Sequence, residues 1–310
     1  MTTGRRLHLR AATRGSALAR WQTEHVGQLL AAAGRGAGVS VELEAVVVQT
    51  VADTRQEVPI WEMGGKGVFV KEVQSAVLEG RADLAVHSAK DLPSGTPDGL
   101  VLAAVPERAD ARDVLVGSSL EGLPPGGVVA TGSVRRRAQL AWTRPDLTFA
   151  GLRGNIATRL EKAAGFDAIV MAAAAVQRLG LDLAGRTVEV LDPSVVLPQV
   201  GQGALAVECA EGHHAALDLL GAIEHGPSRT TLEAERSYLA ELGGDCDLPA
   251  GAHATLLDDE LVVEGLLASL DGHVVLRERR RGAPADAAAL GRDLARHLLD
   301  DAGGASLLVG

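Results

Sequence analysis

Apolar and polar positions follow a strand–helix rhythm along the first two-thirds of the chain. Short apolar runs predict strands, and longer amphipathic stretches predict helices. The expected strands are 7–12, 41–48 and 83–86, and the expected helices are 16–33 and 67–78. This repeated βαβ order indicates an α/β fold with parallel sheets.

Two pairs of segments within this region resemble each other. AATRGSALARWQ and VVATGSVRRRAQL both run from a strand through Thr and Gly-Ser into a helix, which matches Ser16 with Ser133. GRADLAVHSAKDL and AGFDAIVMAAAAVQRL form a second pair in the same order. We interpret them as two similar α/β lobes with a cleft between them. Chance similarity between βαβ units is an equally weighted alternative.

The pattern changes near residue 226. A helix at 229–242 leads into a Gly-rich loop, and strands at 260–270 and 273–279 form a hairpin around Asp271-Gly272. A final helix is expected at 285–300. These elements predict a small α+β domain.

The predicted organisation therefore has three domains. The segments 106–112 and 197–203 are interpreted as crossings between the lobes. Lobe 1 comprises 1–105 and 201–222, lobe 2 comprises 109–198, and the C-terminal domain comprises 226–310.

Composition narrows the possible functions. The 310 residues carry a formal net charge of -10, and only 2% are aromatic. General nucleic-acid binding needs basic surface and stacking platforms, so we expect no nucleic-acid partner. No apolar run is long enough for a membrane span, and no apolar region follows the basic start. Two cysteines make no disulfide framework, and we expect a cytoplasmic protein.

Arginines accumulate where predicted strands lead into helices. Ser16 and Ser133 are expected N-caps, and free N–H groups at a helix start attract anions. The guanidinium group of an arginine can donate two parallel hydrogen bonds to one carboxylate. The sequence predicts three anion sites, formed by Arg14, by Arg135 with Arg136, and by Arg153 with Arg159. Salt bridges on solvated helix faces are the alternative for each arginine.

His87-Ser88-Ala89-Lys90-Asp91 follows a short apolar strand, where side chains of parallel sheets often form sites. An ordinary loop is an equally weighted alternative. The glycine-rich loop 62–67 lacks the spacing of a nucleotide P-loop. The loose dinucleotide fingerprint at 201–206 follows no clear strand and is rejected.

The two cysteines differ in their surroundings. Cys209 lies in an alternating apolar strand and is expected to be buried. Cys246 lies among glycines and aspartates and is expected to be accessible. Asp245 and Asp247 disfavour a thiolate there. The two aspartates therefore argue against a cysteine that must be a thiolate in every turnover. They argue less against a cysteine that is alkylated once and then remains a thioether.

Taken together, the segments resemble the hydroxymethylbilane synthase (porphobilinogen deaminase) family. The matching stretches occur in family order from Ala12 to Ala254: ATRGSALARWQ, GGKGVFVKE, HSAKDLPS, TGSVRRRAQL, LRGNIATRLEK, VQRLGL, PQVGQGALAVEC and GGDCDLPAGAHA. The resemblance implies two periplasmic-binding-protein-like lobes and a small α+β domain. It implies a monomeric transferase that condenses four porphobilinogen molecules head to tail, with release of ammonia and linear hydroxymethylbilane.

The resemblance also implies roles for individual residues. Asp91 would be catalytic, and Cys246 would hold a dipyrromethane cofactor through a thioether. The other cofactor-binding residues would be Ser88, Lys90, Thr131, Ser133, Arg135, Arg136 and Arg159. The substrate-binding residues would be Arg14, Ser16, Lys66, Arg153 and Arg178. No metal is implied.

Three positions depart from the family pattern. Asp245 stands where Gly usually precedes the cysteine, Glu62 replaces a lysine of some relatives, and Ala175 replaces a frequent Gly. They put in doubt the loop around Cys246, the charge near residue 62, where the resemblance implies the family's lid loop, and the anion site at Arg178. A bilobal receptor for a small polycarboxylate, without catalysis, is the alternative function, since a shared fold does not fix function.

Overall fold

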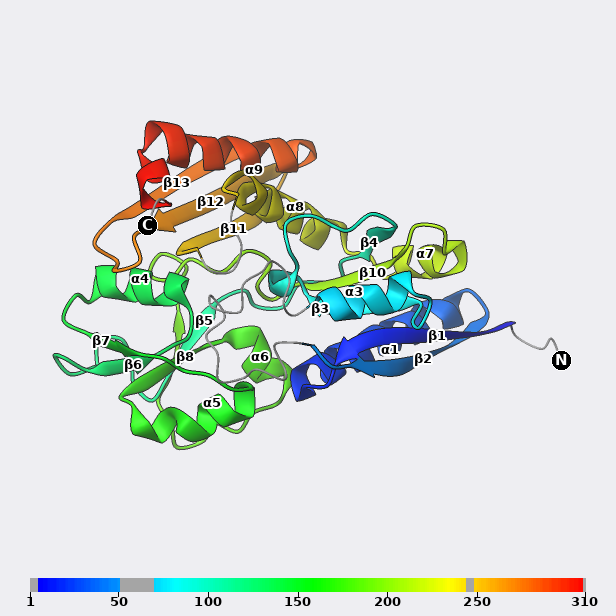
Figure 1. Ribbon diagram of the computed structural model, residues 1–310, viewed down its shortest axis with the longest axis horizontal. Coiled ribbons are helices and arrows are strands. Elements are labelled where there is room, and N and C mark those ends of the chain that lie inside the picture. Colours follow the sequence, from blue (N-terminus) through cyan, green and yellow to red (C-terminus); the bar gives the residue numbers. More distant parts are fainter. Residues whose placement is uncertain (1–4, 51–69, 244–247, 309–310) are drawn as a thin grey trace. The chain divides into compact units, whose positions relative to one another are not determined.

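The computed structural model describes residues 5–50, 70–243 and 248–308. The chain divides into two compact units, one made of residues 1–108 and 204–229 and the other of 109–203 and 230–310. The described residues form three sheets, which Figure 1 shows with their helices.

The first unit contains a five-stranded sheet in the order β2-β1-β3-β10-β4. β1 runs parallel to β2 and β3, whereas β10 runs antiparallel to both β3 and β4. Their bounds are β1 Arg5–Arg14, β2 Val39–Val48, β3 Leu84–Ser88, β4 Leu100–Ala104 and β10 Leu205–Ala210. β10 follows the predicted crossing at 197–203. It lies between β3 and β4, which come from the first part of the chain.

Helices cover both faces of this sheet. Leu30 of α1 (Ala17–Gly36) and Leu220 of α7 (His214–Gly221) share one apolar cluster with alternate strand residues. Val73 of α3 (Lys71–Leu78) belongs to a second cluster, which includes Ala85. Successive strand residues point to opposite faces, so the sheet is the middle layer of three.

The second unit contains a sheet in the order β7-β6-β8-β5-β9. β6 is parallel to β7 and β8, and β5 is antiparallel to β8 and β9. Their bounds are β5 Asp113–Val116, β6 Val128–Ala130, β7 Thr148–Ala150, β8 Ala168–Ala172 and β9 Val188–Leu191.

The two five-stranded sheets therefore have corresponding strand orders and directions. Both repeated sequence motifs fall on corresponding strands, β1 with β6 and β3 with β8. The prediction of two similar α/β lobes is confirmed at the level of topology.

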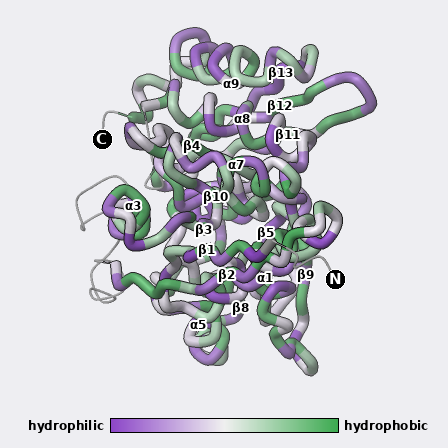
Figure 2. Tube along the Cα trace, turned by 90° about the vertical axis from the view of Figure 1, so that its right-hand side faces the viewer, coloured by the Kyte–Doolittle hydropathy of each residue, from purple (hydrophilic) through white to green (hydrophobic). Residues whose placement is uncertain are grey.

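Three helices pack on the second sheet. Leu140 of α4 (Val134–Thr143) lies in the apolar cluster on one face. α5 (Ile156–Lys162) and α6 (Ala173–Arg178) contribute to the cluster on the other face. Hydrophilic and hydrophobic segments alternate along the covering helices, as α3 and α5 in Figure 2 illustrate.

The C-terminal part of the second unit is a three-stranded antiparallel sheet in the order β11-β12-β13. Tyr238 of α8 and Leu294 of α9 form its core with the strands. The bounds are α8 Gly226–Glu241, β11 Ala250–Leu257, β12 Glu260–Ala268, β13 Val275–Gly282 and α9 Ala287–Arg296. Residues 297–301 continue α9 as a π-helical turn.

The predicted α/β class is confirmed, with several shifted boundaries. α1 begins at Ala17 because Ser16 is its N-cap, and α3 begins at Lys71 rather than at residue 67. Strand β11 was missed because a Gly-rich loop was expected there. Cys209 is fully buried as predicted, but every residue from Leu205 to Cys209 is buried, so the alternation expected for this strand was wrong. The three-domain division stays a prediction.

Candidate active site

The carboxyl ends of β1 and β3 meet at one edge of the first sheet, because the two strands are parallel and adjacent. Arg14 is the last residue of β1, and Ser88 is the last residue of β3. A 3-10 helix, η2 (Ala89–Asp91), follows β3 directly and carries Asp91. The strand order thus brings together residues that are far apart in the sequence.

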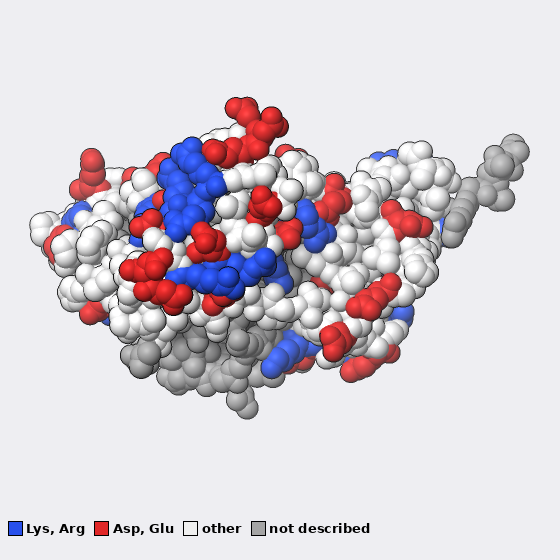
Figure 3. All heavy atoms as spheres, turned by 90° about the horizontal axis from the view of Figure 1, so that it is seen from above, with Lys and Arg blue, Asp and Glu red and all other residues white. Residues whose placement is uncertain are grey.

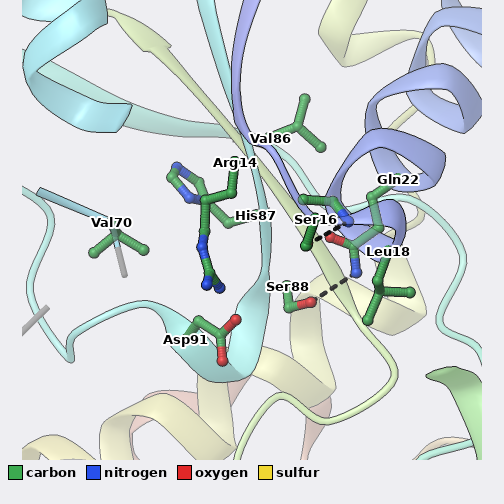
Figure 4. Close-up of a pocket in the computed structure, with 10 residues that line it drawn as sticks. Arg14, Ser16, Leu18, Gln22, Val70, Val86, His87, Ser88 and Asp91 are labelled. Carbon is green, nitrogen blue, oxygen red and sulfur yellow. Dashed lines mark hydrogen bonds between the residues drawn. The ribbon is translucent and has the colours of Figure 1, made fainter. Parts of the chain in front are cut away.

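A pocket lies at this edge of the sheet. Its polar lining residues are Arg14, Ser16, Gln22, His87, Ser88 and Asp91, and its apolar lining comes from Leu18, Ala19, Val70 and Val86. Figure 4 shows the guanidinium group of Arg14 pointing toward the carboxylate of Asp91. The pocket therefore combines a cation, a carboxylate and hydroxyl groups, a set suited to a ligand with both acidic and N–H groups.

Two hydrogen bonds hold the wall of the pocket opposite Asp91. The Ser16 hydroxyl accepts from the Ala19 N–H at 3.3 Å, which confirms the predicted N-cap. The Gln22 side-chain amide donates to the Ser88 hydroxyl at 2.7 Å. Gln22 is only 2% exposed, and this bond links α1 to the end of β3.

The second unit holds a buried charge cluster where α4 packs on its sheet. Asp113 of β5 accepts from Nη2 of Arg135 and from Nη2 of Arg136, each at 2.7 Å. Nε2 of Gln202 donates to Oδ1 of Asp113 at 2.8 Å. Burial alone would raise the pKa of the Asp113 carboxyl, but the charges of both arginines hold that pKa well below its usual range.

The two guanidinium groups are also anchored on backbone carbonyls. Nη1 of Arg135 donates to the Leu197 carbonyl, and Nη1 of Arg136 donates to the Val170 carbonyl. Nε of each arginine is buried and has no hydrogen-bond partner among the described atoms. The cluster carries one net positive charge, and a buried unpaired donor is costly unless a ligand or water pairs with it. These residues fit an acidic group.

The other anion-site residues of the second unit lie at helix starts or ends. The Ser133 hydroxyl accepts from the Arg136 N–H, so Ser133 is the predicted N-cap of α4. The Thr131 hydroxyl accepts from the Ser133 N–H at 3.2 Å. These contacts fix the turn between β6 and α4.

Three further arginines are half-buried. Nε of Arg159 donates to the Gly154 carbonyl at 2.8 Å, and Nη2 of Arg178 donates to the Gly203 carbonyl at 2.7 Å. Burial lowers the pKa of Arg178 to about 10, and it also lowers the pKa of Arg153. Solvent screens a partly buried cation less than an exposed one, so these arginines would attract a carboxylate more strongly.

Five of the singled-out residues lie outside the described part of the chain: Glu62, Lys66, Asp245, Cys246 and Asp247. Lys90 lies in η2 with Asp91 but is not one of the residues that line the described pocket. Ala175, one of the departures from the family pattern, is buried in α6.

Sequence reasoning missed three polar residues that belong to these sites. Gln22 is buried in α1, Asp113 is the first residue of the apolar strand β5, and Glu208 is buried in β10, 3.0 Å from His87 of the pocket. A charged or amide side chain within an apolar pattern was the available signal, because such residues are buried only with partners.

The described residues contain no helix long and apolar enough to cross a membrane. Nor do they contain a cluster of His, Cys, Asp or Glu that could hold a metal ion. On the face shown in Figure 3, basic and acidic side chains are interspersed. In the C-terminal sheet, Nε of Arg277 and Nη2 of Arg279 both lie within 2.9 Å of the Glu264 carboxylate.

Two family models match the chain. The model described as "Porphobilinogen deaminase, dipyromethane cofactor binding domain" matches residues 9–218. The model described as "Porphobilinogen deaminase, C-terminal domain" matches residues 230–300.

Curated relatives match over nearly the whole length. A porphobilinogen deaminase from Nitratidesulfovibrio vulgaris (strain DP4) is 45% identical over 97% of this chain and 96% of its own length. One from the Miyazaki F strain of that species is 48% identical over 94% of each chain. One from Roseiflexus castenholzii is 46% identical over 96% of this chain and 97% of its own.

Similar solved structures are more distant. An ancestral cationic amino acid solute binding protein matches with a TM-score of 0.40 and 15% identity, over 70% of this chain and 88% of its own. The regulatory domain of OxyR from Pseudomonas aeruginosa matches with a TM-score of 0.37 and 13% identity, over 71% of this chain and 97% of its own.

Proposed function

The chain belongs to the porphobilinogen deaminase family, and from this premise we propose which residues carry out the family's reaction. The protein is a transferase of tetrapyrrole biosynthesis that condenses four porphobilinogen molecules head to tail. It releases ammonia, forms linear hydroxymethylbilane, and uses a dipyrromethane cofactor.

We propose that Asp91 is the catalytic residue. Positive charge develops on the substrate as ammonia leaves, and a carboxylate fixed in a pocket stabilises such charge without reorganisation. The same carboxylate can accept hydrogen bonds from pyrrole N–H groups and can move a proton between substrate and ammonia. The observation that carries this proposal is the pocket that places Asp91 beside Arg14 at the ends of β1 and β3.

The arginines are proposed to hold the acetate and propionate groups of substrate and cofactor. Substrate carboxylates are assigned to Arg14, Ser16, Lys66, Arg153 and Arg178, and cofactor carboxylates to Ser88, Lys90, Thr131, Ser133, Arg135, Arg136 and Arg159. The net positive charge of the Asp113 cluster and its two unpartnered Nε atoms support the cofactor assignment. Cys246 is proposed as the thioether attachment point. When bound, dipyrromethane supplies the pyrrole carbon to which the first substrate molecule is joined.

Incubation of the purified chain with porphobilinogen tests the activity. We expect ammonia release together with hydroxymethylbilane, and binding without ammonia release would contradict the enzyme. That second outcome is what a non-catalytic receptor for a small polycarboxylate would give, a function that the family membership does not favour.

We further propose that the enzyme works as a monomer in the cytoplasm, without a membrane or nucleic-acid partner. The acidic net charge and the scarcity of aromatic residues support the last point. Light scattering after size-exclusion chromatography tests the oligomeric state, and a mass of twice 32.0 kDa would contradict a monomer. Fractionation of the source cells tests the location.

A further inference from the structure

Three buried polar side chains meet behind the pocket of the first unit: Gln74 of α3, His87 of β3 and Glu208 of β10. Gln74 is 3% exposed, His87 is 5% exposed and Glu208 is fully buried. Nε2 of Gln74 donates to both carboxylate oxygens of Glu208, at 3.2 and 2.9 Å. Nε2 of His87 lies 3.0 Å from Oε2 of Glu208.

Nε2 of His87 and Oε2 of Glu208 are at hydrogen-bond distance, but the contact is not aligned as a hydrogen bond. Nε2 of His87 has no aligned hydrogen-bond partner among the described atoms, although the carboxylate is within reach. A buried carboxylate is costly unless it is paired and hydrogen-bonded, and a fixed apolar core would avoid that cost. Gln74 supplies hydrogen bonds to both oxygens of Glu208, so His87 faces a carboxylate that is already held in place.

The cluster lies on the same side of the sheet as Arg14. Ala12 and Ala85 belong to the apolar cluster that faces α3, and Arg14 and His87 each stand two residues further along the same strands. β10 pairs with β3 so that Ala206 lies opposite His87, which places Glu208 diagonally across from it on that face. His87 lines the pocket together with Arg14 and Asp91.

We propose that Glu208 is a positioning residue of the active site, acting through the imidazole of His87 on the pocket that holds Arg14 and Asp91. This inference rests on the proposed function of that pocket. Glu208 is fully buried and is not among the residues that line the pocket, so its effect must pass through its partner.

Two physical effects give Glu208 this role. The imidazole is buried against Glu208, and this packing restrains the end of β3, from which Ser88 and, through η2, Asp91 project into the pocket. The buried negative charge is also poorly screened by solvent, so it adds to the field in which positive charge develops on the substrate. Both effects act on the transition state more than on the binding of substrate, and they predict a change in kcat.

The test is steady-state kinetics with porphobilinogen on Glu208→Gln, His87→Gln and the double variant, each confirmed by intact mass to carry dipyrromethane. We expect kcat to fall about tenfold in each single variant with KM unchanged. The double variant should be no slower than the slower single variant, because the two side chains act as one unit.

Two results would overturn the inference: a wild-type kcat in Glu208→Gln, or losses that multiply in the double variant. A wild-type protein that releases no ammonia would instead refute the proposed function, so the two failures are distinguishable.

If Glu208→Gln does not fold, Gln74→Leu tests the same link, because it removes both hydrogen bonds to Glu208 and leaves the side chains of His87 and Glu208 unchanged. We expect a smaller loss of kcat that disappears in the His87→Gln background. An unchanged kcat in Gln74→Leu would overturn the inference in that case.

Asp83→Asn is the matched control. Asp83 directly precedes β3 at the end away from the pocket, and its carboxylate pairs with Arg10 at 2.9 Å. This variant should lower the melting temperature and leave kcat unchanged. The imidazole 1H–15N signals of His87 should move in Glu208→Gln and stay in place in Asp83→Asn. An equal loss of kcat in Asp83→Asn would show a general effect of destabilising β3 and would overturn the inference.

Discussion

Asp113 and Arg135 form an ion pair in which Oδ2 and Nη2 lie 2.7 Å apart, and neither side chain is more than 3% exposed. Arg136 pairs with the other carboxylate oxygen at the same distance. One carboxylate on β5 thus holds two consecutive arginines of α4. The orientation of both proposed cofactor ligands depends on a residue that the sequence motif does not contain.

Asp113→Asn should destabilise the second unit strongly. The variant leaves two buried guanidinium groups without a counter-charge, a change that typically costs about 3–5 kcal/mol. Chemical denaturation followed by circular dichroism measures the loss. Asp110→Asn is the control, because Asp110 pairs with the more exposed Arg112 and its loss should cost about 1 kcal/mol or less. Equal losses in the two variants would contradict the importance of burial.

The same cluster predicts how stability depends on pH. The pKa of Asp113 is lowered in the folded state, so its contribution is present above the unfolded-state pKa of about 4. The contribution is lost as the pH falls through the folded-state pKa. Unfolding measured from neutral to acidic pH should therefore show a steep loss for the wild type and a shallower one for Asp113→Asn. Parallel curves would contradict the assignment.

The sequence predicted the helices and strands more accurately than the tertiary contacts of their side chains. Ser16 and Ser133 could be identified as N-caps because capping is decided within one helical turn. The hydrogen-bond partners of Arg135 could not be predicted. Asp113 and Leu197 are far from Arg135 in the sequence, and they contact it only when separate strands and loops pack together. Local chemistry was therefore readable from the sequence, and tertiary pairing was not.

The candidate site shows the same division. The motif around Asp91 was recognisable, and the parallel order of β1 and β3 explains why Arg14 lies in the same pocket. The sequence alone did not single out Gln22, which is buried in α1. Its bond to Ser88 depends on how α1 packs on the sheet, which no local pattern encodes.

Asp91→Asn should nearly abolish turnover while preserving the fold. The amide has almost the same shape but no charge, so it cannot stabilise the positive charge that develops on the substrate. Removal of one preorganised electrostatic group typically lowers kcat about 100- to 1000-fold. Ammonia release measures the effect, and an unchanged melting temperature shows that the fold is intact. Asp98→Asn, on an exposed turn after the same motif, is the control. Near-normal activity of Asp91→Asn would remove Asp91 from its role.

Tyr238→Phe should affect stability alone. The Tyr238 hydroxyl is buried in the C-terminal core and donates to the Leu266 carbonyl at 2.9 Å. Its loss should cost about 1 kcal/mol, whereas Tyr238→Ala adds a cavity and should cost about 3–5 kcal/mol. Differential scanning calorimetry compares the two, and kcat should match the wild type in Tyr238→Phe. A lower kcat without loss of cofactor would show that this core is coupled to the site.

Cys246→Ser should abolish covalent attachment of the cofactor. A serine hydroxyl lacks the nucleophilic thiol that a thioether requires, so the purified variant should have the unmodified mass. The wild type should carry the additional mass of one dipyrromethane. Cys209→Ala is the matched control, because Cys209 is fully buried and burial raises the pKa of its thiol to about 11. The control should keep the additional mass.

In the native wild type, a thiol reagent should react with neither cysteine, and unfolding should expose Cys209 alone. An active wild type of unmodified mass would refute covalent attachment, and loss of the additional mass in Cys209→Ala would reassign it.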